Sequence, residues 1–284
     1  LTDEGKALLG EAREVLELYG GAAGTLTDRG VREHRMLAVR MYKRYPSVFR
    51  KGPRKVRVSA STVHRSLVSM ASFTTGLSAL CPRLDFSMCS NDVVFSWINN
   101  SSPKDVRSEI KTMLRPIDDS PVDTVWILSH LFTDPGAGRD VLGDVGRFEH
   151  KVWWTAAVAE NFDIGTDLYR HLPFDVVYKY YDRLNRYNYL GQCNSVEFGD
   201  IRMPLCKPLA DDVLLKAEDA IAGGGVAADF RFGHDYPCIA LACYLGMEAA
   251  GDRCSVDEIP SHWFGPKIMC LACNVQMIFY RNRK

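Results

Sequence analysis

The sequence has no long hydrophobic run and no excess charge of either sign. None of its apolar stretches approaches the roughly 20 residues that a membrane-spanning helix needs, so no membrane span is expected. Its 35 basic residues balance 35 acidic ones, unlike the strongly basic surfaces of proteins that bind nucleic acids or anionic membranes. A nucleic-acid partner is therefore not expected, and any site for an anion must be local.

Cysteine is present but lacks the dense, regular spacing of a disulfide-stabilised fold. The nine cysteines are an odd number, scattered through apolar surroundings. One Cys-x-x-Cys motif, Cys270 to Cys273, has no second such motif and no paired histidines beside it. Packed thiols are therefore favoured over a metal or redox site, and neither a metal nor a cofactor is expected.

The chain begins at Leu1, without an initiator methionine or a signal peptide and already within a helical pattern. We expect a fragment or a processed product whose targeting signal lies outside the printed sequence. Apolar residues at helical spacing follow two similar segments, LTDEG from residue 1 and LTDRG from residue 26. Two helices are therefore expected to open the chain.

Four short segments predict β-strands because they alternate in polarity or are rich in β-branched and aromatic residues. They are residues 55–60 (KVRVSA), 84–88, 226–232 (VAADFRF) and 270–280. After the first strand, Ser61 and Thr62 are placed to cap the helix that follows.

A long middle segment, residues 103–190, instead shows helical spacing with many aromatic residues, interrupted by a turn predicted at 134–138 (DPGAG). Strands that alternate with helices predict an α/β fold with an open sheet core and flanking helices. We assign residues 1–90 and 191–284 to this core and residues 91–190 to a mainly α-helical cap inserted into it.

Ionisable residues stand at two junctions where a predicted strand gives way to a helix. Arg65 follows the strand at 55–60, and His234 and Asp235 follow the strand at 226–232. Ligands of open α/β sheets bind at the carboxyl ends of strands, where helix N-termini attract anions. Arg65 would bind phosphate oxygens, with His64 at the edge of the pocket. Structural interpretations remain open: a solvated arginine, a buried histidine, and an aspartate that caps a helix.

Several segments together resemble the histidine phosphatase superfamily, in its acid phosphatase and phytase branch. They are LTDRGVREHRMLAVRMYKRYPSVF, VRVSASTVHRSLVSMASF, RFGHDYPCIALACYLG and NVQMIFYRN. The similarity extends from residue 1 to about 281, and it is greatest to bacterial proteins similar to multiple inositol polyphosphate phosphatase. It implies a phosphoglycerate mutase-like α/β core with an α-helical cap, and hydrolysis of phosphomonoesters through a phosphohistidine, without a metal.

The resemblance also implies roles for individual residues. Arg65 matches an arginine that holds the phosphate, His234 matches the second active-site histidine, and Asp235 matches the acid that protonates the leaving oxygen. The family's nucleophile belongs to an Arg-His-Gly-x-Arg motif, which the printed sequence lacks. The motif is expected upstream of Leu1, because Arg170-His171 continues into Leu172-Pro173 and is interpreted as structural.

The expected substrate is a small phosphorylated molecule, and inositol polyphosphates such as phytate are favoured. Many inositol polyphosphate phosphatases carry His-Ala-Glu where this chain has His234-Asp235. A broad-specificity or sugar-phosphate acid phosphatase therefore remains an alternative. Another is a non-catalytic anion-binding domain without the nucleophile. Because members of the family are often exported, a periplasmic or extracellular location is expected.

Overall fold

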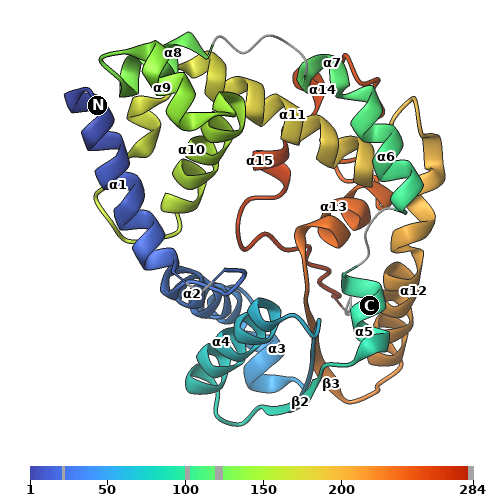
Figure 1. Ribbon diagram of the computed structural model, residues 1–284. Helices are drawn as coiled ribbons and strands as arrows, with labels where there is room; N and C mark the ends of the chain where they lie inside the picture. Colours follow the sequence, from blue (N-terminus) through green and yellow to red (C-terminus); the bar gives the residue numbers. More distant parts are fainter. Residues whose placement is uncertain (21–22, 100–102, 119–123, 281–284) are drawn as a thin grey trace. The chain divides into compact units, whose positions relative to one another are not determined.

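The computed structural model describes residues 1–20, 23–99, 103–118 and 124–280 (Figure 1). The chain divides into two compact units, and each is built from two separate stretches of sequence. One unit comprises residues 1–29 and 113–184, and the other comprises residues 30–112 and 185–284. Among the described residues, no helix combines the length and apolar character needed to cross a membrane.

The first unit is helical. Its elements are α1 (Asp3–Tyr19), α7 (Arg115–Asp118), α8 (Val125–Leu131), α9 (Pro135–Leu142), α10 (Val145–Ala159), the short 3-10 helix η1 (Leu168–His171) and the first part of α11 (Phe174–Gln192). Buried apolar side chains from α1, α8, α10, η1 and α11 form one core, which includes Leu8, Ile127, Trp153 and Leu168. We call this part the helical unit.

The second unit contains the three strands found among the described residues, and we call it the sheet unit. Its elements are α2 (Asp28–Arg44), α3 (Pro46–Lys51), β1 (Lys55–Ala60), α4 (His64–Leu80), β2 (Asp85–Cys89), α5 (Asp92–Ile98), α6 (Lys104–Met113), η2 (Gly199–Arg202), α12 (Met203–Ile221), β3 (Val226–Phe232), α13 (Asp235–Tyr244), α14 (Ile259–His262) and α15 (Gly265–Ile268).

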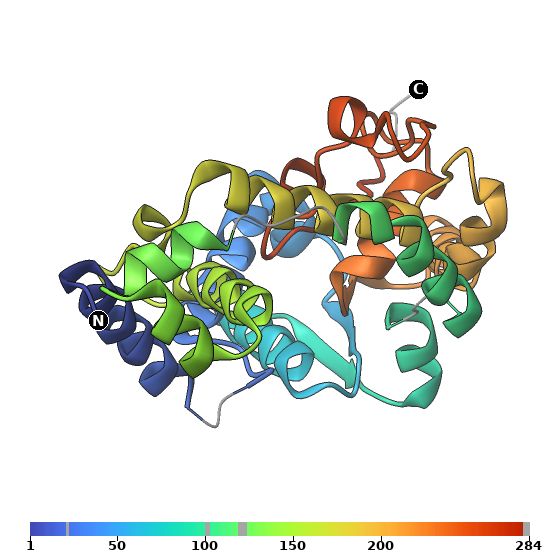
Figure 2. The same cartoon turned by 45° about the horizontal axis from the view of Figure 1, so that its top comes forward.

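The sheet is parallel, with strand order β2-β1-β3. Helices α2, α3 and α4 lie near the sheet (Figures 1 and 2). Val56, Val58 and Ala60 of β1 are buried in a core with residues of these helices. Phe73 of α4 lies edge-on to Phe230 of β3, with ring centroids 4.9 Å apart. The period-2 burial of β1 follows from its alternating sequence, and it fixes the register because a one-residue slip would expose every buried valine.

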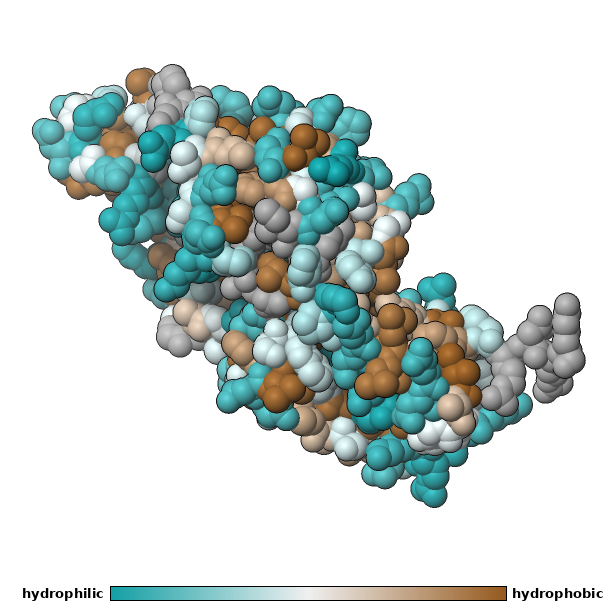
Figure 3. All heavy atoms as spheres, turned by 90° about the vertical axis from the view of Figure 1, so that its right-hand side faces the viewer, coloured by the Kyte–Doolittle hydropathy of each residue, from teal (hydrophilic) through white to brown (hydrophobic). Residues whose placement is uncertain are grey.

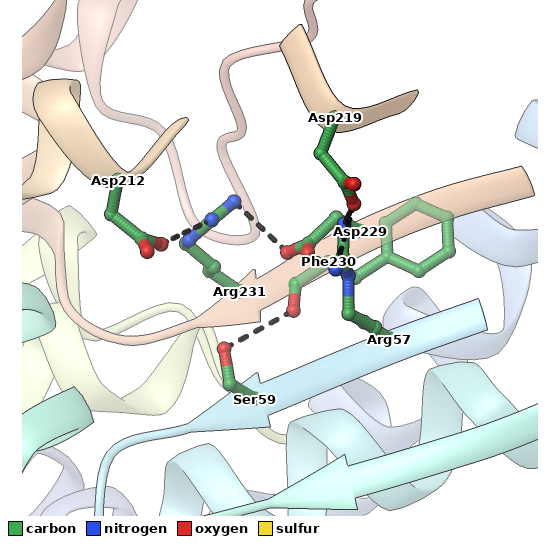
Figure 4. Close-up of polar contacts among 7 residues, drawn as sticks. All are labelled: Arg57, Ser59, Asp212, Asp219, Asp229, Phe230 and Arg231. Carbon is green, nitrogen blue, oxygen red and sulfur yellow. Dashed lines mark hydrogen bonds and ion pairs between the residues drawn. The ribbon is translucent and has the colours of Figure 1, made fainter. Parts of the chain in front are cut away.

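The opposite face of the sheet is held by ion pairs to α12 (Figure 4). Asp229 forms ion pairs with Arg57, 2.9 Å from its Nε, and with Arg231, 3.1 Å from its Nη1. From α12, Asp212 pairs with Arg231 at 2.5 Å and Asp219 pairs with Arg57 at 3.4 Å. Because most of these side chains are half-buried, the pairs are screened less by water than ordinary surface ion pairs. Charge complementarity therefore fixes α12 on this face.

Figure 3 shows the molecule from the side on which α12 lies in Figure 1. Hydrophobic residues occur there in small groups separated by hydrophilic ones. Leu214 and Leu215 of α12 are among the exposed apolar side chains of the protein. Scattered exposed apolar residues are normal for a globular protein surface, so they do not call for a functional explanation.

The predicted strands at 55–60, 84–88 and 226–232 correspond to β1, β2 and β3. The predicted strand at 270–280 is wrong: after α15 the chain runs to residue 280 without regular structure, although Val275 packs partly against the α5, α12 and α13 core. An apolar stretch predicts that its side chains are buried, but a β-strand also requires a neighbouring strand with which its backbone can hydrogen-bond.

The turn predicted at 134–138 is also wrong, because this segment begins a helix. Asp134 is the N-cap of α9, and its Oδ1 accepts hydrogen bonds from the amides of Gly136 and Ala137. Pro135 occupies the first helical position, where its missing N–H costs nothing. The same residues that mark a turn can thus begin a helix when an aspartate precedes the proline.

The two units differ from the predicted domains. Residues 1–29 lie with the helical unit rather than the core, and residues 91–112 lie with the sheet unit. The predicted helical character of residues 103–190 is confirmed for the described part of this segment. Its role as a cap over the site stays a prediction.

Gly5 allows α1 to approach α8 closely. A Cβ at this position would lie 2.5 Å from the carbonyl oxygen of Leu131 and 2.8 Å from its Cα, and backbone atoms cannot move away cheaply. Gly5→Ala should therefore lower the free energy of unfolding by about 1–3 kcal/mol, the usual cost of overpacking. Urea unfolding followed by circular dichroism measures the change.

Gly10 on the same helix is the matched control, because a Cβ there would meet nothing within 4 Å. Gly10→Ala should raise the free energy of unfolding by up to about 1 kcal/mol through helix propensity. Equal effects of the two substitutions would contradict the close contact between α1 and Leu131.

Candidate active site

The carboxyl ends of β1 and β3 lie side by side. Ala60 is in register with Phe232, and the amide of Ser61 continues the pairing by donating to the Phe232 carbonyl at 2.9 Å. The Ser66 hydroxyl then donates to the carbonyl of Gly233 at 3.3 Å. The two strand-to-helix junctions identified in the sequence are therefore brought together, as parallel pairing predicts.

His234 is the centre of this cluster. Its Nδ1 lies 3.2 Å from Nη2 of Arg65, and its Nε2 lies 3.2 Å from Oγ of Ser61. A guanidinium can only donate, so Nδ1 must accept and the proton of the neutral ring must reside on Nε2. Nε2 then donates to the Ser61 hydroxyl. The contacts thus specify one tautomer of a neutral imidazole.

The surroundings of His234 also oppose its protonation. Burial lowers the pKa of the imidazole below its usual value, and the charge of Arg65 lowers it further, while Asp235 acts in the opposite direction. A bound anion would reverse this balance, because a negative charge beside His234 favours the imidazolium. The site therefore has one permanent cation, Arg65, and a second cation that an anion can induce.

The helix that carries Arg65 presents an open N-terminus to the same place. Val63 is the N-cap of α4, and no side chain caps the helix there. The predicted capping by Ser61 or Thr62 is thus wrong, since Ser61 contacts His234 instead. Uncapped amides and the positive end of a 17-residue helix favour an anion beside Arg65.

Asp235 is the first residue of α13, and its side chain is exposed. Its Oδ1 accepts a hydrogen bond from the amide of Tyr236 at 3.0 Å. The N-cap position itself is occupied by His234, whose side chain makes no capping bond. Asp235 therefore begins the helix without being its N-cap residue, and its carboxyl group lies beside the residue that contacts Arg65.

His64, expected at the edge of the pocket, is the exposed first residue of α4. His64 precedes Arg65 in the sequence, but the side chain of His234 contacts those of Arg65 and Ser61. Sequence reasoning missed Ser61 as a site residue. It is fully buried, and its position directly after a strand is the only sequence signal that marks it.

A cavity of about 120 Å³ lies next to the start of α13. Its lining residues are Arg107, Ile110, Tyr187, Asn188, Gly191, Gln192 and Tyr236. Tyr236 follows Asp235 directly, so this cavity adjoins the candidate site. Arg107, tyrosine hydroxyls and side-chain amides give it hydrogen-bond donors suited to a polar or anionic group.

The chain matches no protein-family model and no curated protein sequence. Among solved structures it is similar to the multiple inositol polyphosphate phosphatase of Bifidobacterium longum in complex with inositol hexasulfate. The TM-score is 0.73 at 16% identity, and the match covers 95% of this chain and 74% of that one. The phosphate complex of that enzyme gives a TM-score of 0.68 at 15% identity, covering 90% and 68%.

The phytase of D. castellii is also similar, with a TM-score of 0.50 at 12% identity, covering 86% of this chain and 58% of that one. These neighbours are enzymes of the kind that the sequence motifs resemble. At such identities the likeness shows the fold. The chain therefore has the helix-rich α/β fold, with a small open parallel sheet, that was expected from the resemblance to the histidine phosphatase superfamily.

Replacing Arg65 should raise the pKa of His234. Arg65→Ala removes the nearby positive charge that disfavours the imidazolium, while Asp235 continues to favour it. An NMR titration of the histidine ring signals measures the pKa, and His234→Gln assigns the resonance. Arg13→Ala, which removes an exposed arginine of the helical unit, should leave it unchanged. A pKa that stays constant or falls in Arg65→Ala would contradict the contact.

Proposed function

We propose that this chain provides the phosphate-binding and proton-donating part of a phosphomonoester hydrolase that works through a phosphohistidine. The observation that carries the proposal is the direct contact of Arg65 with His234 at the paired ends of β1 and β3. Phosphoryl transfer depends mainly on positioning and on stabilising charge at the phosphate oxygens. The permanently charged guanidinium of Arg65, the His234 imidazole that gains a proton when an anion binds, and the uncapped N-terminus of α4 together suit that task.

In the proposed reaction, Arg65 and His234 donate hydrogen bonds to the phosphate oxygens. A nucleophilic histidine forms an N–P bond as the P–O bond to the leaving group breaks, and protonated Asp235 gives its proton to the departing oxygen. Water then attacks the phosphorus of the phosphohistidine, and the N–P bond breaks as the new O–P bond forms. The Asp235 carboxylate takes a proton from this water, and inorganic phosphate leaves.

The nucleophile must come from the Arg-His-Gly-x-Arg segment that the printed sequence lacks, and we place that segment upstream of Leu1. β3 is an edge strand of the described sheet. Strands in a sheet lie about 4.8 Å apart, so a further parallel strand paired with β3 would end beside His234. A strand added at β2 would end two strands further away. The β3 edge is thus the favoured place for the nucleophile.

Inositol polyphosphates are the substrates that we favour. The cavity beside Asp235 has room for a further polar group and includes Arg107 among its lining residues, which suits a substrate with more than one phosphate. The solved neighbours are named as an inositol polyphosphate phosphatase and a phytase. The periplasmic or extracellular location and the lack of a cofactor stay predictions from the resemblance.

Two other functions have specific observations behind them. The His234-Asp235 pair also fits a broad-specificity or sugar-phosphate acid phosphatase, and the absence of Arg-His-Gly from the printed sequence fits a non-catalytic anion-binding domain. A chain extended upstream separates all three. It should release phosphate faster from inositol hexakisphosphate than from a sugar monophosphate. The reverse preference favours the acid phosphatase, and anion binding without turnover favours the binding domain.

Asp235→Asn should slow phosphohistidine formation strongly for alkyl phosphates and much less for nitrophenyl phosphate. An alkoxide is a poor leaving group that needs a proton as the bond breaks, whereas nitrophenolate needs it much less. Loss of general acid catalysis typically costs 10²–10⁴-fold, so about that reduction is expected for inositol hexakisphosphate. Single-turnover reactions of the extended chain measure the step without interference from hydrolysis of the phosphoenzyme.

Asp257→Asn, which changes an exposed aspartate elsewhere in the sheet unit, is the control and should leave both rates unchanged. The side-chain oxygen of asparagine can also accept from the Tyr236 amide, so a purely structural Asp235 would lose little on either substrate. An equal loss on both substrates would falsify the role of Asp235 as proton donor.

A further inference from the structure

Three potential metal ligands meet in the helical unit, far from each other in sequence. Glu4 lies in the first turn of α1, His130 lies near the end of α8, and His171 is the last residue of η1. One ligand atom from each lies within 4.8 Å of the other two. We propose that these residues bind a divalent transition-metal ion, with Zn²⁺ as the best match. The site is independent of the proposed phosphatase chemistry.

The distances fit a tetrahedral ion. Nε2 of His130 lies 3.2 Å from Nδ1 of His171, and two nitrogens bound to one tetrahedral Zn²⁺ lie about 3.3 Å apart. Oε2 of Glu4 is 3.9 Å from Nδ1 of His171, about half an ångström beyond the same geometry. The Glu4 side chain is 68% exposed, so a small rotation closes that difference at little cost.

The proton positions leave one nitrogen of His171 available to a cation. Nε2 of His171 lies 3.2 Å from Oε2 of Glu11, whose other oxygen is paired with Arg170. This ion-paired carboxylate is an acceptor, so it holds the His171 proton on Nε2 and leaves Nδ1 as an acceptor. Nδ1 then faces both His130 and the carboxylate of Glu4. Without an ion, Nε2 of His130 donates to Nδ1 at 3.2 Å; in its other tautomer Nε2 also becomes an acceptor, and both ring nitrogens can then bind one metal ion.

A carboxylate behind a ligating histidine is the usual companion of a metal site, because it fixes the ring and raises its basicity. Here Glu11 fills that position, and the His171 side chain is 2% exposed. Two imidazoles with one carboxylate are borderline ligands that suit Zn²⁺ better than Mg²⁺ or Ca²⁺, which prefer oxygen. Three protein ligands also leave a fourth position for water.

The ligands are held by the close packing of α1 on α8 (Figure 1). The amide of Thr2 donates to the Leu131 carbonyl at 2.9 Å, and its hydroxyl bonds to the carbonyl of His130. Gly5 allows this approach because a larger residue would collide with Leu131. The ends of α1 and α8 therefore stay together without the ion, and the metal would bind a site that the fold has largely formed.

The experiment titrates the metal-free 284-residue chain with Co²⁺ and Zn²⁺, using calorimetry and the visible absorption of Co²⁺. We expect one equivalent to bind, with a tetrahedral cobalt spectrum and no thiolate charge-transfer band. His130→Gln and Glu4→Gln should each abolish this spectrum, and Glu11→Gln should weaken binding by about 10–100-fold. His262→Gln and Glu17→Gln, which change exposed residues outside the cluster, should bind as the wild type does.

Glu4 and His130 serve as the decisive variants because Glu4 is exposed and His130 is only half-buried, whereas the deeply buried His171 is needed for packing. Circular dichroism checks that both variants keep the wild-type fold. The absence of binding in the wild type would overturn the proposal. So would a spectrum that persists in both variants, or a thiolate band, because the ion would then lie on other residues.

Discussion

The candidate site depends on the parallel pairing of β1 with β3. These strands are separated by more than 160 residues, yet Ala60 and Phe232 are in register and Ser61 continues the pairing with its amide. Both strands present apolar residues to α4 on one face and charged residues to α12 on the other. Each face therefore selects the same register, and that register brings Arg65 and His234 into contact.

The electrostatics of the site follow from this contact. Partial burial and the neighbouring guanidinium both lower the pKa of the His234 imidazole, so an empty site disfavours two adjacent positive charges. A bound anion favours protonation of His234, because its negative charge stabilises the imidazolium. The anion is then held by two cations, Arg65 and His234. The proposed function thus uses a pair of groups of which the second, His234, becomes positively charged when an anion binds. Ion pairs among Arg57, Asp229 and Arg231 hold β1 and β3 together beneath it (Figure 4).

The sequence predicts the parts of the fold that local patterns determine. Alternating valines identify β1, and a strand followed by His-Asp and helical spacing identifies the junction at residue 234. The segment at 270–280 has a similar apolar character, but strand formation depends on a partner, which its own residues cannot specify. Likewise, the local sequence predicts that Ser61 caps a helix, because its contact with His234 spans 173 residues and leaves no local pattern. Glu4, His130 and His171 lie on three elements that are far apart in the sequence. No short motif therefore marks this cluster, and the sequence could not predict it.

The central claim is that Arg65 and His234 form one anion site at the ends of β1 and β3. A crystal structure of the 284-residue chain grown with tungstate, a tetrahedral oxyanion of strong scattering, tests it most directly. We predict an anion within hydrogen-bonding distance of the Arg65 guanidinium and the His234 ring, beside the first turn of α4. A tungstate bound elsewhere, with Arg65 still donating to Nδ1 of His234, would contradict the account.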